Sequence, residues 1–134
     1  MELHLKIIGY ILIVLSLMHL IFPKKFNWKE EFKSVSLINK EMMYIHTFFI
    51  GLFILLNGLL CLFCTYDLIN TTLGKQISLG LFIFWVCRLA LQFVGYSSTL
   101  WKGKTFETIV HIIFTIFWFY TSFIFLMNYL GKSL

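Results

Sequence analysis

The hydrophobic residues of this chain gather into four long runs, at about 3–23, 44–64, 77–96 and 108–130, and most charged residues lie between them. Each run has about 20 residues, the length that a helix rising ~1.5 Å per residue needs to cross a ~30 Å hydrocarbon core. Transmembrane β-strands are about half as long and alternate polar with apolar residues, which these runs do not. The pattern therefore predicts four transmembrane helices.

The connections between these runs are short, so neighbouring helices are expected to be antiparallel. In the first connection, Asn27 and Glu30 have the spacing of a capping box, and Trp28 is a typical interfacial anchor. Ser36 or Asn39 provides an alternative cap for an early start of the second span. We expect one all-α domain over residues 1–134. It is a polytopic membrane protein, an up-down-up-down four-helix transmembrane bundle with a short interfacial helix between helices 1 and 2.

The amino-acid composition supports the interpretation as a membrane protein. The 134 residues are 60% apolar and 13% charged, whereas soluble domains have about 25% charged residues. A water-soluble fold of this length has too much surface to cover with so few polar side chains. The net charge of +5 fits attraction to anionic lipid headgroups. We therefore expect the lipid bilayer as the partner and no nucleic acid.

Lysine and arginine in the loops predict the orientation of the chain, because cytoplasmic loops carry an excess of these residues. The first and third loops together contain seven lysines, and the opposite side contains three. The chain is therefore predicted to be a multi-pass protein of the cell membrane with both termini extracytoplasmic. The seven are Lys24, Lys25, Lys29, Lys33, Lys40, Lys102 and Lys104, and the three are Lys6, Lys75 and Lys132.

Cys61 and Cys64 have the spacing of a redox or metal motif. They lie inside an apolar run, and Cys87 is the one remaining cysteine, so no second pair is present to shuttle electrons. Buried cysteine behaves as a small hydrophobic residue. We interpret this pair as part of the apolar interior.

Polar residues inside the spans are the candidates for function, because they are costly in lipid and usually face the protein interior. His19, His46 and His111 come from three different runs, each within ~6 Å of the predicted cytoplasmic edge by helical rise. Gln92 falls at a similar depth, and Arg88 lies ~12 Å below the edge. We expect these five side chains to meet at the cytoplasmic end of the bundle.

The leading hypothesis for this cluster is a site that binds a metal ion or haem b and serves a redox or lipid-directed reaction. Imidazole suits both groups, and Glu107 precedes His111 by one helical turn. The expected metal ligands are His19, His46, His111 and Glu107. The expected cofactor-binding residues are His19, His46, His111 and Gln92. The expected catalytic residues are Arg88 and His111, acting on a lipid or quinone ligand.

Two alternatives stay open from the sequence. In the first, the protein is a cofactor-free enzyme or carrier that binds a lipid-like anion through Arg88, with a histidine moving a proton. In the second, it is a non-catalytic accessory subunit of a larger membrane complex, or a homo-oligomer, and the polar cluster only specifies helix packing. The sequence does not decide whether the chain is an enzyme.

The lysine distribution generates a prediction about topology. Single cysteines placed at either terminus of a cysteine-free variant are expected to react with a membrane-impermeant maleimide in intact cells. Cysteines placed in the 24–43 and 97–106 segments are expected to react only after the membrane is permeabilised. Labelling of these two segments in intact cells, with protected termini, would contradict the orientation.

Overall fold

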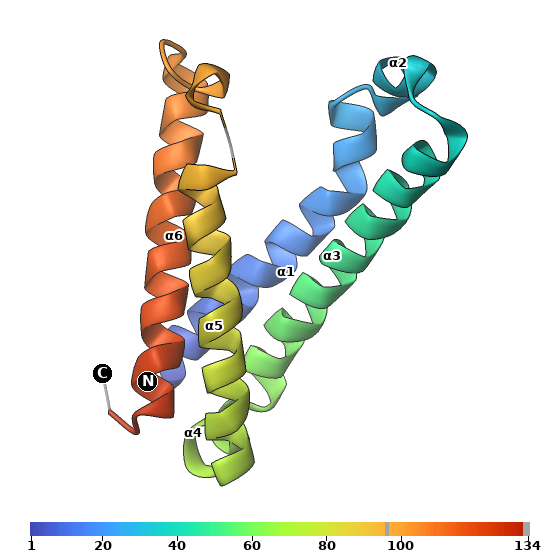
Figure 1. Cartoon of the computed structure of the whole chain (residues 1–134). Coiled ribbons are helices and arrows are strands. Elements are labelled where there is room, and N and C mark those ends of the chain that lie inside the picture. Colours follow the sequence, from blue (N-terminus) through green and yellow to red (C-terminus); the bar gives the residue numbers. More distant parts are fainter. Residues whose placement is uncertain (96, 133–134) are drawn as a thin grey trace. The chain divides into compact units, whose positions relative to one another are not determined.

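A computed structural model describes residues 1–95 and 97–132, and within them every regular element is helical (Figure 1). Three of the helices are preceded by an N-cap residue, which lies just outside the helix. These residues are Asn27, Ser36 and Thr71. The elements are α1 (Glu2–Lys25), α2 (Trp28–Glu31), η1 (Phe32–Ser34), α3 (Leu37–Phe63), α4 (Thr65–Asn70), α5 (Thr72–Val94), η2 (Ser98–Leu100) and α6 (Thr105–Tyr129).

Four of these helices, α1, α3, α5 and α6, are long and apolar enough to span a membrane, with 24, 27, 23 and 25 residues. They confirm the predicted all-α class with four spans and are consistent with a four-helix bundle. Large apolar side chains are exposed along all four, among them Leu20, Phe49, Val94 and Ile116. Such extended exposed apolar surface is suited to lipid rather than to water.

The chain divides into two compact units. The first, Leu3–Thr65, contains α1 and α3 and is named the N-terminal hairpin. The second, Tyr66–Leu134 together with Met1–Glu2, contains α5 and α6 and is named the C-terminal hairpin.

In the N-terminal hairpin, α1 and α3 touch through glycines. A Cβ atom on Gly58 would lie 2.9 Å from the Gly9 carbonyl oxygen and 2.9 Å from the Ile13 side chain. One on Gly51 would lie 3.1 Å from the His19 Cβ. Small residues let helix backbones approach in lipid, where no hydrophobic effect drives helices together. The face of α3 that carries Gly51 and Gly58 therefore contacts α1 within the hairpin.

The segment after α1 contains the predicted short helix, α2, but not the predicted capping box. Asn27 has φ 47° and ψ 44° and makes no side-chain cap bond. Asparagine tolerates this left-handed conformation better than most residues, so its backbone ends α1 and begins α2. Trp28 and Phe32 then pack on Tyr44, with ring centroids 5.3 and 6.4 Å away. Ser36, one of the two alternative caps predicted, directly precedes α3 but makes no side-chain cap bond.

The second connection is more helical than its turn-like sequence suggests. Thr65 donates its hydroxyl to the Cys61 carbonyl, and Thr71 accepts a bond from the Gly74 amide and caps α5. A Cβ on Gly74 would lie 2.1 Å from the Asp67 carbonyl oxygen. Only glycine permits this close approach, so α4 folds against the first turn of α5. Consequently α5 begins earlier than predicted, at Thr72. The fourth span, α6, also begins earlier than predicted, at Thr105.

The contact between α1 and α3 generates a prediction about stability. Gly58→Ala is expected to destabilise the protein by about 1–3 kcal/mol, because the added methyl group must displace the α1 backbone. Gly80→Ala is the matched control, since a Cβ at Gly80 meets nothing within 4 Å. The free energy of unfolding can be measured by denaturation in mixed detergent micelles. Equal stability of the two variants would contradict the glycine contact.

Candidate functional site

Three of the predicted site residues form a hydrogen-bonded chain in the C-terminal hairpin. Arg88 Nη1 donates to Gln92 Oε1 at 3.2 Å, one turn along α5. The Gln92 amide nitrogen in turn lies 3.0 Å from His111 Nδ1 on α6. Gln92 is buried, whereas Arg88 and His111 are half-buried. The predicted site residues of α5 and α6 therefore contact each other, through Gln92 and His111.

The orientation of the Gln92 amide determines the tautomer of neutral His111. A guanidinium has only donors, so the amide atom that faces Arg88 is the oxygen. The amide nitrogen then donates to His111 Nδ1, which must accept. A neutral His111 consequently carries its hydrogen on Nε2. The chain presents donors, the Arg88 guanidinium at one end and the His111 Nε2–H at the other.

Aromatic rings surround this hydrogen-bonded chain. Trp101 stacks on His111, with centroids 4.6 Å apart and planes at 15°. The Trp101 carbonyl accepts a 2.7 Å bond from the Thr108 hydroxyl, which ties the loop to the first turn of α6. On the other side, Arg88 Cζ lies 5.2 Å from the centroid of Trp118, at cation–π distance. Trp118 stacks at 4.9 Å on Trp85.

The same unit contains buried polar atoms without a hydrogen-bond partner among the described residues. They are Nε1 of Trp85, Trp101 and Trp118, and Oγ1 of Thr121. Leaving a buried donor unsatisfied costs about 1–3 kcal/mol. Three of the four are indole N–H groups, which can only donate. The Arg88 guanidinium is likewise a donor group, so donors outnumber acceptors among the polar side chains of this region.

Most other polar residues of the spans satisfy themselves within their own helix. The hydroxyls of Ser16, Thr115 and Ser122 donate to backbone carbonyls three or four residues earlier, at 2.7–2.8 Å. The Asn57 amide does the same with Phe53, at 2.8 Å. These bonds remove the cost of a polar group in lipid without any ligand. Position on a polar helix face therefore does not by itself mark a functional residue.

Asn128 is a buried polar residue that the sequence analysis did not single out. Its amide donates to the Leu68 carbonyl at 2.9 Å and to the Ser78 hydroxyl at 2.7 Å. The Ser78 hydroxyl donates onward to the Gly74 carbonyl. Every donor of this group has an acceptor, so it ties α4, α5 and α6 together and has no capacity left for chemistry. The partners are 50 and 60 residues away, which no local pattern reveals.

His19 belongs to the N-terminal hairpin, and its neutral ring is the opposite tautomer to that of His111. Its Nδ1 lies 2.8 Å from the Leu15 carbonyl oxygen. A carbonyl can only accept, so Nδ1 carries the hydrogen and Nε2 presents a lone pair. Metal-bound histidines have this arrangement, with the second nitrogen donating to an acceptor. His111, whose Nδ1 receives an N–H, does not.

The remaining predicted ligands, His46 and Glu107, are both exposed. Within either hairpin, the described residues contain no group of three His, Cys, Asp or Glu side chains placed to hold a metal ion. A site built from His19, His46 and His111 would draw on both hairpins, and it stays a prediction. Cys61 is buried, in agreement with its interpretation as a small apolar residue.

Comparison with known proteins adds no family to this description. No protein-family model, curated protein or solved structure matches the chain.

The opposite forms of the two histidines can be measured directly. In long-range N–H correlation spectra of protein labelled with ¹⁵N-histidine, neutral His111 is expected to carry its hydrogen on Nε2 and neutral His19 on Nδ1. Gln92→Leu removes the donor to His111 and is expected to abolish the preference of His111 alone. Protonation of His111 on Nδ1 in the unaltered protein would contradict the amide orientation, and His19 serves as the internal control.

Proposed function

We propose that this integral membrane protein binds the anionic head of a lipid-like molecule in its C-terminal hairpin, with Arg88 as the principal contact. The observation that carries the proposal is the chain from Arg88 through Gln92 to His111, which has a donor group at each end, the Arg88 guanidinium and the Nε2–H of neutral His111. A carboxylate or phosphate accepts several hydrogen bonds at once, and a guanidinium matches the geometry of both.

The surroundings of Arg88 support an anion in particular. An arginine within a span costs ~2.5–3.5 kcal/mol even on lenient insertion scales, so a compensating group is expected. Trp118 supplies part of this through its ring face. The Trp85 ring stacks on Trp118, so the positive charge of Arg88 lies beside an aromatic pair. An anionic head bound to Arg88 would complete the compensation of this charge.

The depth of the site supports a lipid-like rather than a water-soluble ligand. Arg88 and His111 each lie six residues from the helix ends Val94 and Thr105, or ~9 Å by helical rise. With the helix ends at the outer edge of the headgroup layer, which is about 5–8 Å thick, this depth reaches the hydrocarbon. Lys102 and Lys104 lie in the loop at the same end of the hairpin and favour the approach of an anionic head.

The proposal competes with the metal or haem hypothesis. The form of His111 favours an anion, because a ligating His111 would need an acceptor, not an N–H donor, beside Nδ1. The form of His19 is compatible with a metal, with His46 as the next ligand to consider. Elemental analysis and a Soret absorption band of protein purified without chelators test this hypothesis directly. A bound metal or haem in stoichiometric amount would favour it over the anion.

The test of the proposal compares binding of oleate, a phosphatidic acid and inorganic phosphate to protein in phosphatidylcholine nanodiscs. Arg88→Gln is expected to weaken lipid-anion binding by about tenfold to a hundredfold, since hydrogen bonds to charged groups contribute about 1.5–3 kcal/mol. Arg88→Lys keeps the charge but loses the planar fork, so we expect an intermediate loss. Tight binding of inorganic phosphate alone would show that the anion needs no lipid body.

Lys29→Gln is the matched control, because it removes one positive charge from an exposed position in the N-terminal hairpin. It is expected to leave the dissociation constant unchanged. An equal effect of the two glutamine variants would reduce the interaction to general surface charge and contradict the site. Normal assembly and unchanged ligand content of Arg88→Leu would instead favour the accessory-subunit hypothesis.

A further inference from the structure

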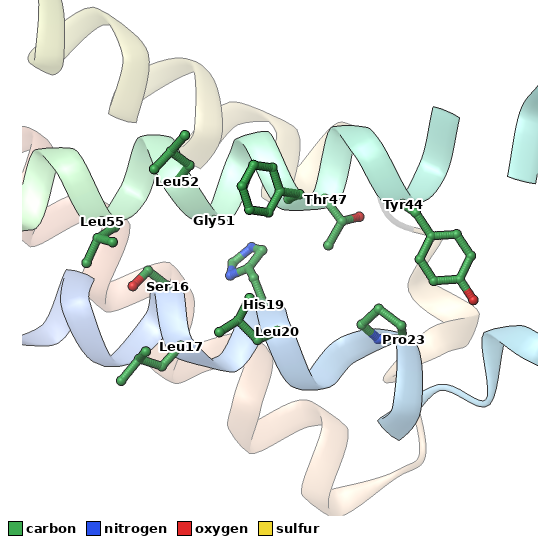
Figure 2. Close-up of a pocket in the computed structure, with 11 residues that line it drawn as sticks. Ser16, Leu17, His19, Leu20, Pro23, Tyr44, Thr47, Gly51, Leu52 and Leu55 are labelled. Carbon is green, nitrogen blue, oxygen red and sulfur yellow. The ribbon is translucent and has the colours of Figure 1, made fainter. Parts of the chain in front are cut away.

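The N-terminal hairpin contains a cavity of about 390 Å³ between α1 and α3 (Figure 2). This volume lies within the range of small-molecule sites in proteins, about 300–1,000 Å³. The imidazole of His19 rises from α1 into the space beside Gly51 (Figure 2), where the absence of a side chain leaves room for the ring. Most of the lining is apolar, including Leu17, Leu20, Leu52 and Leu55.

The polar groups on the α1 side of this cavity are acceptors. His19 Nε2 has a lone pair, because Nδ1 gives its hydrogen to the Leu15 carbonyl. The Ser16 hydroxyl gives its hydrogen to the Ile13 carbonyl at 2.7 Å, so its oxygen can only accept a further bond. Pro23 has no N–H, so the His19 carbonyl does not receive the usual helical bond from it.

From these observations we infer that the cavity binds an apolar molecule with one hydroxyl group, which donates its hydrogen to His19 Nε2. The apolar lining accommodates a hydrocarbon body, and the acceptors require a donor on the ligand. The α3 side adds the hydroxyls of Tyr44 and Thr47, which can either donate or accept, so the requirement for a donor comes from His19 and Ser16 on the α1 side. The cavity thus differs in polarity from the Arg88 site, and the inference does not depend on the proposed function.

The experiment uses the full chain in phosphatidylcholine nanodiscs and three probes, dodecanol, its methyl ether and dodecane. Each competes with a diazirine-bearing long-chain alcohol, whose crosslinks are located by mass spectrometry. Dodecanol is expected to bind about tenfold more tightly than the ether, which keeps the oxygen but has no hydrogen to donate. Crosslinks are expected on residues that line the cavity, such as Thr47 and Leu52. Equal binding of alcohol and ether would overturn the hydroxyl assignment.

Three variants complete the test. His19→Phe keeps a ring but removes the acceptor, so dodecanol is expected to fall to the affinity of the ether. His4→Phe is the matched control, since His4 is another histidine of α1 that does not line the cavity, and it should keep the preference for the alcohol. Leu52→Trp fills the cavity and is expected to weaken both probes at least about tenfold. Undiminished binding to Leu52→Trp, or crosslinks outside the cavity, would overturn the site, even if His19→Phe fails to fold.

Discussion

The hydrogen bond from Arg88 to the Gln92 oxygen sets the polarity of the whole C-terminal hairpin site. A guanidinium can never accept, so the oxygen of the amide must face it and the nitrogen must face α6. His111 is thereby made an acceptor at Nδ1 and a donor at Nε2. Reversing the amide would place two donors against each other in a region with little water, where an unsatisfied donor is expensive. The stacked Trp101 then holds the His111 ring in one plane. The orientation of the Gln92 side chain on α5 thus fixes the hydrogen position of His111, which in turn stacks on Trp101 in the loop before α6.

The two hairpins show how one residue type acquires different chemistry from its partner. His19 donates from Nδ1 to a backbone carbonyl, and His111 accepts at Nδ1 from an amide. The first ring offers a lone pair and the second offers a hydrogen, although both lie about six residues from the end of a span. Charge also differs, because Arg88 stands in the second hairpin and the cavity beside His19 is mainly apolar. The two sites therefore suit ligands of opposite hydrogen-bonding character.

In hydrocarbon, helices gain little from burying apolar surface against one another, and packing depends on shape and on polar contacts. The N-terminal hairpin uses shape, with Gly9 and Gly58 bringing two backbones together. The C-terminal hairpin uses polar contacts, with Asn128 joining Ser78 and the Leu68 carbonyl. The hydroxyls of Ser16, Thr115 and Ser122 bond to their own helices and take part in neither. Because one hairpin is held by glycine contacts and the other by a small number of polar contacts, few polar residues of the spans bond to another helix.

The sequence by itself determined the class of the protein, because the length and apolarity of four runs suffice to predict four spanning helices. It also indicated that Gln92 and His111 lie at a similar depth at the same end of the bundle as Arg88, which lies deeper, since helical rise converts position into depth. It could not determine the form of either histidine, which depends on which atom of a neighbouring group faces the ring. Nor could it find the cavity beside His19, which arises where Gly51 of one helix faces a ring on another. Periodicity along one helix is local information, whereas the direction of a donor and the space between two helices depend on how the helices contact each other, and only the tertiary structure contains them.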